Sequence, residues 1–562
     1  MKLKPGAASE EENKAGMSAI KSRMAELKQI RDGDVLTEWE ELAPWVLPRR
    51  DFWLPKTRGG LRRKKLVDLS GAINCERAAA LIHGYMINPW EPWIRPRLQT
   101  PRDLSREEEI WFEDTGDRIF NFLSGSRSSY RTASHEALLD WITFGNSVKW
   151  SGSAGAAQRP YFKSVPLKEC YWAEGEDGTV DTLYRRFTMT LINAVKRAQA
   201  LGVFEALPGL KRKWNDGKCN HQEELTMVRA VEPRVDGVYG AAGINKPFSS
   251  VLYCEDTDDV FQVSGFDLFP FTVSRLTKRA GSAYGQGLAW NALPAIKLLN
   301  ALKEGLLRQA EQEADPALID VNGVFRDKAL DRRPGAVNFL QGADFGLAQP
   351  RELLQRVQQQ GNLQINVELV RELRREIEQA FFTDWMALGE GKYVTAEHTA
   401  SIRDLRLRAM SPMVARGEQE DLTHTGDRAF YLLQKSGGFT EAPQTLADEV
   451  VDYDYTSPLA QAQKRGELEE VDRVIQGAMA LRDLDPDSLD VFDFDEIARS
   501  RAKATGAPVR YTRSLDEVER LRAERQKRRQ QQEQAEQAEK QARALRDGSQ
   551  ALNTAGLTPE AV

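Results

Sequence analysis

Apolar residues in the first part of this 562-residue chain recur at the spacing of amphipathic helices. Ile20, Met24 and Leu27 follow one another at steps of four and three, which predicts a short helix over residues 17–30. The same pattern, with capping residues before it, predicts helices at residues 68–86, 105–124 and 128–144. This part of the chain is therefore predicted to be largely helical.

The apolar period changes to two between residues 159 and 190, as in a strand with one buried face. Asp177-Gly178 lies between the runs 171–178 and 180–187 and predicts a hairpin turn. More strands are predicted at 224–232 and 248–271, and a helix at 190–201. Taken with the helices, these strands predict an α+β fold that is mainly helical.

Two long helices flank a short segment with strand and turn signals. The first, residues 288–310, contains Pro294 in its early part. Its broad apolar face consists of Leu298, Leu299, Leu302, Leu306 and Leu307. The second begins near Ile365 and carries apolar residues at steps of four, namely Leu369, Leu373, Ile377 and Phe381. Residues 316–340, between the two helices, include the turn signal Asn322-Gly323.

A Gly-rich loop at residues 388–393 precedes a third long helix, predicted over residues 395–435. Thr395 is suited to cap this helix, and Ser411-Pro412 predicts a kink in it. A helical C-terminal region opens at residue 457. Its last helix begins near Arg513 and continues to about Arg546 with many Arg and Gln residues and few apolar ones. We expect that last segment to be solvated or partly disordered.

The balance of charge is slightly acidic, because 78 Lys and Arg stand against 84 Asp and Glu and give a net charge of -6. A protein that coats nucleic acid needs a basic face, so this balance argues against that class. It still permits a channel in which DNA slides. The four scattered cysteines indicate a reducing compartment. No secretory signal or membrane-spanning run is found, so we expect an intracellular protein without membrane contact.

Patterns that indicate catalysis are few, and we predict no enzyme activity, metal or cofactor. No Gly-x-x-x-x-Gly-Lys-Ser/Thr motif is present. A zinc site could be assembled only from Cys170, Cys219, His221 and Cys254. Their spacing fits no paired motif, which favours plain thiols. His135 has no recognisable Ser or Cys partner. The acids between residues 483 and 495 alternate with apolar residues, which favours a helix with an acidic rim over a calcium site.

Six short segments carry a resemblance to a known family. They are Trp45-Val-Leu-Pro-Arg, the aromatic-proline cluster 89–93, the hairpin segment 177–186, the glycine-rich 281–287, Val394-Thr-Ala-Glu and the segment 457–463. In this order and spacing they resemble the portal (head-to-tail connector) proteins of short-tailed double-stranded DNA phages, the podoviruses. The similarity extends over most of the chain. Its most informative part is the elbow at 281–287, where an aromatic strand ends and a long helix begins.

The resemblance implies the phage portal fold, in which wing, stem, clip and crown assemble as a ring of twelve subunits. The regions it implies are a wing at 1–284, a first stem helix at 285–313, a clip at 314–361, a second stem helix at 362–385, a tunnel loop at 386–394, a kinked wing helix and link at 395–455, a helical crown at 456–545 and a disordered tail at 546–562. Such a ring is structural. It sits at a unique vertex of the virion, where viral DNA is packaged and later ejected.

The resemblance also implies site residues, at the level of segments. The tunnel loop that would touch DNA consists of Leu388, Gly389, Glu390, Gly391 and Lys392. Subunit contacts in the stem are expected from Lys303, Arg308, Arg371, Arg374 and Arg375. The elbow residues are Tyr284, Gly285 and Gly287. Implied partners are further copies of the chain, double-stranded DNA without sequence preference, the terminase large subunit, major capsid and scaffolding proteins, tail adaptor or nozzle proteins, and internal core proteins.

Several alternatives stay open at this stage. The stem arginines could pair with acids on their own helix face, pair with the next subunit or contact DNA phosphates. The whole chain could instead be an internal virion, ejection or scaffold-type protein, which the Gln/Arg-rich tail favours. A DNA-processing enzyme of the packaging machinery is a third class. It would need a Walker motif or metal-binding carboxylates.

Overall fold

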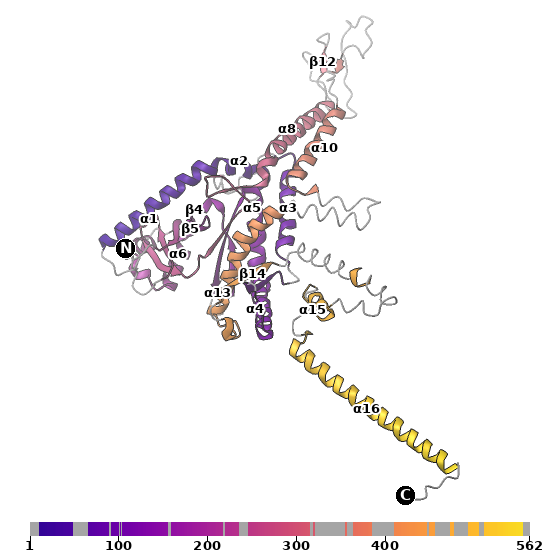
Figure 1. Cartoon of the computed structure of the whole chain (residues 1–562). Coiled ribbons are helices and arrows are strands. Elements are labelled where there is room, and N and C mark those ends of the chain that lie inside the picture. Colours follow the sequence, from indigo (N-terminus) through magenta and orange to yellow (C-terminus); the bar gives the residue numbers. More distant parts are fainter. Residues whose placement is uncertain are drawn as a thin grey trace, which may run out of the picture. The chain divides into compact units, whose positions relative to one another are not determined.

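The computed structural model describes residues 10–48, 66–88, 92–100, 102, 104–154, 159–216, 220–234, 246–314, 318–320, 354–356, 363–384, 410–446, 449–455, 473–476, 493–504 and 511–554 (Figure 1). Two compact units are present. The first consists of Met1–Ile94 and Ile119–Gly438, and the second of Arg95–Arg118 and Phe439–Val562. Residues 95–118, which the sequence assigns to the wing, therefore belong to the same compact unit as the C-terminal part of the chain.

The largest sheet of the first unit has five antiparallel strands in the order β4-β5-β6-β7-β8. Their bounds are β4 Cys170–Glu174, β5 Val180–Thr190, β6 Glu224–Pro233, β7 Phe248–Cys254 and β8 Val260–Phe266. The predicted hairpin is confirmed, since β4 pairs with β5 and Gly178 in their turn has a φ of 77°. Glycine adopts this left-handed conformation without steric cost. The predicted strand region 248–271 divides into β7, β8 and the start of β9.

Helices cover both faces of this sheet because its side chains alternate between two apolar sets. Helix α1 (Glu10–Arg31) shares one core cluster with the sheet. Helices α6 (Leu191–Ala200) and α7 (Pro208–Asn215) share the other. Neighbouring residues of β6 belong to different clusters, Val228 to that of α1 and Met227 to that of α6 and α7. The strand thus has two buried faces.

A second, three-stranded sheet has the order β3-β2-β9. Its strands are β2 Asn146–Ala154, β3 Arg159–Ser164 and β9 Phe271–Arg275. Helix α5 (Tyr130–Phe144) packs on β2 and β3, and helix α3 (Ser70–Met86) packs on α5. Both helices were predicted. A π-helical turn at Asp32–Leu36 joins α1 to α2 (Thr37–Val46), which also contacts α5.

The two predicted long helices are confirmed, and α10 packs along α8 (Figure 1). Two very short paired strands, β10 and β11, come before α8. The bounds are β10 Thr277–Lys278, β11 Gly285–Gln286, α8 Leu288–Ala314 and α10 Leu363–Ala380. Between the helices the structure describes one antiparallel pair, β12 (Leu318–Asp320) with β13 (Leu354–Arg356). The remainder of the predicted clip lies outside the described residues.

The described part of the third long helix starts at Met410. Residues 410–417 are α-helical through Ser411-Pro412, a π-helical segment follows at Glu418–Thr423, and α13 spans His424–Lys435. The change in helical geometry thus falls after the Ser-Pro pair at which a kink was predicted. The predicted start at Thr395 lies outside the described residues.

The π-helical segment carries two acids that reach buried cations of the three-stranded sheet. Lys149 Nζ lies 2.5 Å from Asp421 Oδ1, and both side chains are buried. Buried Arg275 donates from Nη2 to Glu420 Oε1 at 2.7 Å, and its backbone N donates to Glu420 Oε2 at 2.7 Å. An unpaired buried charge is costly, so these pairs fix the segment against β2 and β9.

The second unit is described in less detail. Strand β1 (Ile94–Leu98) pairs with β14 (Val451–Tyr455). A capping box opens α4 (Arg106–Ser124), because Ser105 N donates to Glu108 Oε2 at 2.7 Å and Glu108 N donates to Ser105 Oγ at 3.4 Å. Short 3-10 turns in the two units are Leu167–Glu169, Phe204–Ala206 and Gln444–Leu446.

Two helices are described near the C-terminus. Asp493 Oδ1 accepts two backbone N–H groups at the start of α15 (Phe494–Ala504). The last helix, α16 (Leu515–Thr554), is exposed over almost all of its described length, as its polar sequence predicts. It continues past Arg546, so the predicted tail begins as helix, consistent with the helix-forming Ala, Leu and Gln residues there.

The secondary structure confirms an α+β fold that is mainly helical. Within the described ranges, no helix is both long and apolar enough to cross a membrane.

We predict that replacing Lys149 by Met lowers the free energy of unfolding by about 3 kcal/mol, because Asp421 is left buried without its cation. The double variant Lys149→Met with Asp421→Leu should recover most of that loss, since it removes both charges. Denaturant unfolding of the two variants beside wild type measures this. Equal losses in the single and double variants would show that the unpaired carboxylate of Asp421 is not the cause of the loss.

Candidate functional site

Tyr284, at the predicted elbow, is fully buried in an aromatic cluster. Its ring centroid lies 4.2 Å from that of Trp172 on β4 and 5.9 Å from that of Trp39 on α2. Trp172 Nε1 donates to Ala283 O at 3.0 Å, and the Trp172 backbone N donates to the Tyr284 hydroxyl oxygen at 3.4 Å. Burial raises the pKa of Tyr284, so the phenol stays neutral. The elbow is thus attached to both α2 and β4.

Two glycines of the elbow pass directly against backbone at the end of α5. A Cβ built on Gly287 would lie 2.4 Å from Thr143 O and 2.5 Å from Ile142 O. A Cβ on Gly285 would lie 2.5 Å from the carbonyl oxygen of Gly145. Gly145 itself has a φ of 76°, which favours glycine. Any side chain at these positions would separate the start of α8 from the corner between α5 and β2.

Asn146 closes this corner with hydrogen bonds. Gly285 N donates to Asn146 Oδ1 at 2.8 Å, and Asn146 Nδ2 donates to Gly285 O at 3.0 Å and to Phe144 O at 2.9 Å. The side chain is fully buried, and all these amide groups are satisfied. Asn146 was not predicted from the sequence. The Gly145-Asn146 pair after a helical pattern was the available signal, since both residues commonly end helices.

Asp68 is a buried carboxylate at which both stem helices meet. Lys303 Nζ of α8 lies 2.5 Å from Asp68 Oδ2, and Arg374 Nη2 of α10 lies 3.2 Å from the same oxygen. Ser70 N donates to Asp68 Oδ1 at 2.6 Å at the start of α3. Burial alone would raise the pKa of Asp68, but the hydrogen bonds from Lys303 and Ser70 outweigh it and lower that pKa to about 2.

Two further polar contacts attach the stem helices to the segment around α3. Asn300 Oδ1 on α8 accepts the backbone N–H groups of Val67 at 3.1 Å and Asp68 at 3.0 Å. Thr383, just after α10, donates from Oγ1 to Asn74 Oδ1 at 2.7 Å. Asn300 of α8 and Thr383 after α10 are therefore both tied to residues 67–74.

The five predicted stem cations divide into two groups. Lys303 and Arg374 have a partner within the chain, Asp68, which the sequence did not predict. Arg308 donates to Glu304 Oε1 at 2.7 Å one turn earlier on α8, and both side chains are exposed. Arg371 and Arg375 are exposed on α10. These last three remain candidates for contacts with other molecules.

The predicted apolar face of α8 is only partly buried. Leu299 is inaccessible, whereas Leu298 exposes 48% of its surface and Leu307 exposes 53%. Val367 on the adjacent helix α10 is 40% exposed. The stem pair therefore offers apolar side chains as well as cations at its surface.

The structure describes some of the other predicted site residues and not others. The predicted tunnel loop at residues 388–392 and the thiol of Cys219 lie outside the described residues. Cys170 and Cys254 are buried. His135 packs its ring edge-on against His83, with centroids 5.9 Å apart. Over the ranges that the structure describes, no group of three His, Cys, Asp or Glu side chains could hold a metal ion.

The chain matches the family model described as bacteriophage head to tail connecting protein over residues 17–512. It is 24% identical over 505 residues to the probable portal protein of Bordetella phage BPP-1, covering 86% of each chain. It is 23% identical over 516 residues to the portal protein of Salmonella phage epsilon15, covering 90% of each. A solved neck of an empty GTA particle aligns with a TM-score of 0.35 and 11% identity, over 72% of this chain and 86% of that one. The family match spans both compact units.

We predict that Gly287→Ala destabilises the protein by about 3 kcal/mol, because the new methyl group would overlap two backbone carbonyl oxygens. Gly305→Ala, inside α8, is the control for the same substitution at an open position. Nothing lies within 4 Å of its added Cβ, so it should gain roughly 0.5–1 kcal/mol of helix propensity. Denaturant midpoints of the two variants measure the contrast, and similar midpoints would contradict the close approach.

The lowered pKa of Asp68 makes stability depend on pH. The folded pKa of about 2 lies below the ordinary value of 3.8, so the carboxylate's contribution is complete above about pH 4 and is lost as pH falls toward 2. This contribution amounts to about 2 kcal/mol. Asp68→Asn should remove it at neutral pH and flatten the stability profile between pH 4 and 2. Thermal unfolding across that range tests it, and parallel profiles would refute the assignment.

Proposed function

The chain belongs to the bacteriophage head to tail connecting proteins, and we propose that it is the portal of a phage head, a ring through which DNA passes. The match of the family model to residues 17–512 carries this proposal. In such a role the chain acts mechanically, by forming a channel at the head-to-tail junction of the virion.

The stem pair supports the proposal by its surface chemistry. Leu298 and Leu307 of α8 and Val367 of α10 are exposed in the single chain. Packing against the next subunit would remove them from water, at roughly 25 cal/mol for each Å² buried. Arg308, Arg371 and Arg375 flank this apolar surface on the same two helices and would contact acids of a neighbouring copy or DNA phosphates.

The elbow gives the stem a rigid origin. Backbone contacts of Gly285 and Gly287 with the end of α5, and the buried ring of Tyr284, fix where α8 leaves the wing. Asp68 then holds α8 and α10 by one carboxylate. We assign these residues to positioning the stem, so that each subunit of a ring presents it at the same angle.

The remaining parts of the proposal concern partners. Residues 388–392 would supply the loop that touches DNA without sequence preference, consistent with a net charge of -6 rather than a basic channel. The clip at 314–361 would bind the terminase large subunit during packaging and tail adaptor or nozzle proteins afterwards. Wing and crown would contact major capsid, scaffolding and internal core proteins.

We predict that the purified chain forms rings with a central hole, twelve-fold in symmetry, in native mass measurement and negative-stain images of one fraction. Leu307→Glu should shift the population to species smaller than a ring, because it places a charge in an apolar subunit contact. Leu201→Glu, at an exposed leucine after α6, is the matched control and should leave rings intact.

A wild-type monomer that persists at high concentration and with scaffolding protein added would overturn the portal proposal. If rings still form unchanged with Leu307→Glu, this would show instead that α8 is not part of the contact between subunits.

A further inference from the structure

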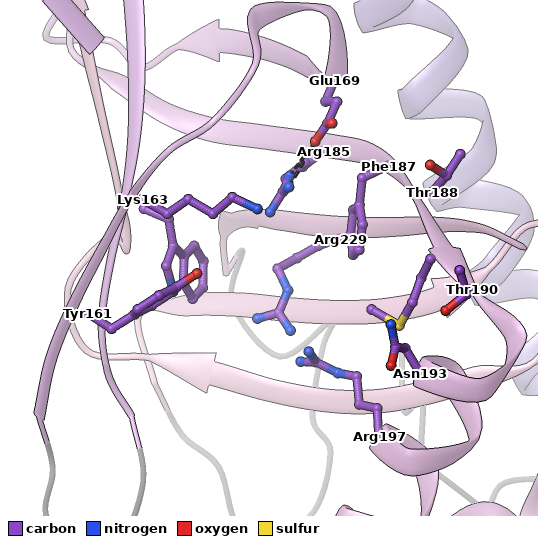
Figure 2. Close-up of a pocket in the computed structure, with 12 residues that line it drawn as sticks. Tyr161, Lys163, Glu169, Arg185, Phe187, Thr188, Thr190, Asn193, Arg197 and Arg229 are labelled. Carbon is purple, nitrogen blue, oxygen red and sulfur yellow. Dashed lines mark hydrogen bonds and ion pairs between the residues drawn. The ribbon is translucent and has the colours of Figure 1, made fainter. Parts of the chain in front are cut away.

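A cavity of about 690 Å³ lies in the first unit (Figure 2), and its described lining residues include none from the elbow, α8 or α10. Strands β2 and β3 of the small sheet, β5 and β6 of the large sheet, and the first turns of α6 line it. Its volume is typical of a small-molecule site. Nothing in the stem or the elbow requires this cavity. Its lining residues can therefore be used to infer what kind of ligand it would bind.

Two arginines of the cavity are placed directly opposite each other on adjacent strands. Arg185 of β5 and Arg229 of β6 are register partners, and Arg197 of α6 approaches from the side. Figure 2 shows the guanidinium groups of Arg229 and Arg197 pointing toward each other. Like charges opposite each other destabilise a sheet. Arg197 and Arg229 therefore repel each other, while the guanidinium group of Arg185 is directed to Glu169 (Figure 2).

The cations of the cavity outnumber its acids. Lys163, Arg185, Arg197 and Arg229 line it with a single carboxylate, Glu169, which gives a formal charge of +3. Glu169 Oε2 is already engaged by Arg185, at 2.9 Å from Nε and 2.8 Å from Nη2. Burial and the neighbouring Arg197 and Arg185 lower the pKa of Arg229 to about 10. Burial is the larger cause of this shift, and repulsion by the neighbouring cations adds to it.

Two buried polar atoms of the lining also lack a partner among the described residues. They are Arg197 Nε and Thr190 Oγ1. Thr190 is the N-cap residue of α6, yet its side chain makes no capping hydrogen bond. Both atoms are shielded from water and so do not themselves face a ligand; the cavity's preference for an anion comes from its cationic groups. The positive end of the α6 dipole adds to the same preference for an anion.

We propose that this cavity binds a compact ligand with several phosphate groups, held by Arg185, Arg197, Arg229 and Lys163. Nothing in the portal proposal supplies or requires this site. The cations approach from four elements, β3, β5, β6 and α6. A planar carboxylate offers two oxygens in one plane, whereas linked phosphates offer acceptors on several sides.

The aromatic lining indicates which phosphate ligands fit. Arg229 lies over the ring of Trp150 at 5.1 Å and Arg185 over that of Phe187 at 4.5 Å, so these rings already position the guanidinium groups. Tyr161 on β3 is 42% exposed and lines the same cavity. It could stack on a base, as aromatic side chains do in nucleic-acid sites. The phosphate groups could thus come from a free nucleotide or from a nucleic-acid strand.

The test is titration calorimetry of the full-length protein, in its native assembly, with sodium tripolyphosphate at constant ionic strength. Wild type should bind one equivalent per chain. Arg197→Gln and Arg229→Gln should each weaken binding about tenfold or more, the loss expected for a charge-assisted contact. Arg212→Gln, at an exposed arginine of α7 outside the cavity, removes the same charge and should change Kd less than about twofold.

Two further titrations distinguish the source of the phosphates. If dATP binds more tightly than tripolyphosphate, and Tyr161→Ala removes this difference, the ligand is a free nucleotide. If a short oligo(dT) binds more tightly than tripolyphosphate, and the same variant removes this difference, the ligand is a single-stranded nucleic acid. Absence of saturable tripolyphosphate binding overturns the proposal, as does equal weakening by Arg212→Gln. Tetraglutamate binding as tightly as tripolyphosphate would also overturn the phosphate class.

Thermal unfolding separates a ligand site from a structural one. Arg229→Gln should raise the Tm of the ligand-free protein, because it relieves repulsion with Arg185 and Arg197, and should abolish the rise that tripolyphosphate causes in wild type. A lowered Tm with an unchanged ligand-induced rise would show instead that Arg229 supports the sheet.

Discussion

The arrangement of the first unit depends on a backbone-to-backbone contact that only glycine permits. Gly285 and Gly287 meet the carbonyl oxygens at the end of α5, and Gly145 turns the chain there with a positive φ. Asn146 joins the two segments by hydrogen bonds in both directions. Because α8 starts one residue after Gly287, this contact fixes the origin of the stem. The aromatic ring of Tyr284 adds a packed layer on its other side.

Buried carboxylates also hold together segments that are distant in sequence. Asp68 binds cations of both stem helices, and Glu420 and Asp421 bind Arg275 and Lys149 across the small sheet. Each bond joins residues separated by well over a hundred positions. Buried charges of this kind specify one arrangement, since displacing either partner leaves the other without compensation.

In the cavity with Arg197 and Arg229, by contrast, the cations are not all matched by acids. Its cations lie together with one carboxylate, and Arg197 Nε and Thr190 Oγ1 have no partner among the described residues. In the rest of the first unit, buried Lys149 and Arg275 are matched by acids. The contrast separates charges used to build the subunit from charges left available to a ligand.

Local patterns in the sequence determined the elements of the fold. Steps of three and four gave the helices around α3, α5, α8 and α10, and Asp177-Gly178 gave the hairpin, because these signals act over a few residues. The motifs around Gly281–Gly287 also indicated the family, and they marked Tyr284, Gly285 and Gly287 as the elbow. The partners of those residues were not predictable. Asn146, Asp68 and the facing Arg185 and Arg229 meet only through strand register and helix packing, which bring together residues with no fixed spacing in the chain. For the same reason Lys303 and Arg374 were predicted as subunit contacts, although the folded chain pairs them with its own Asp68.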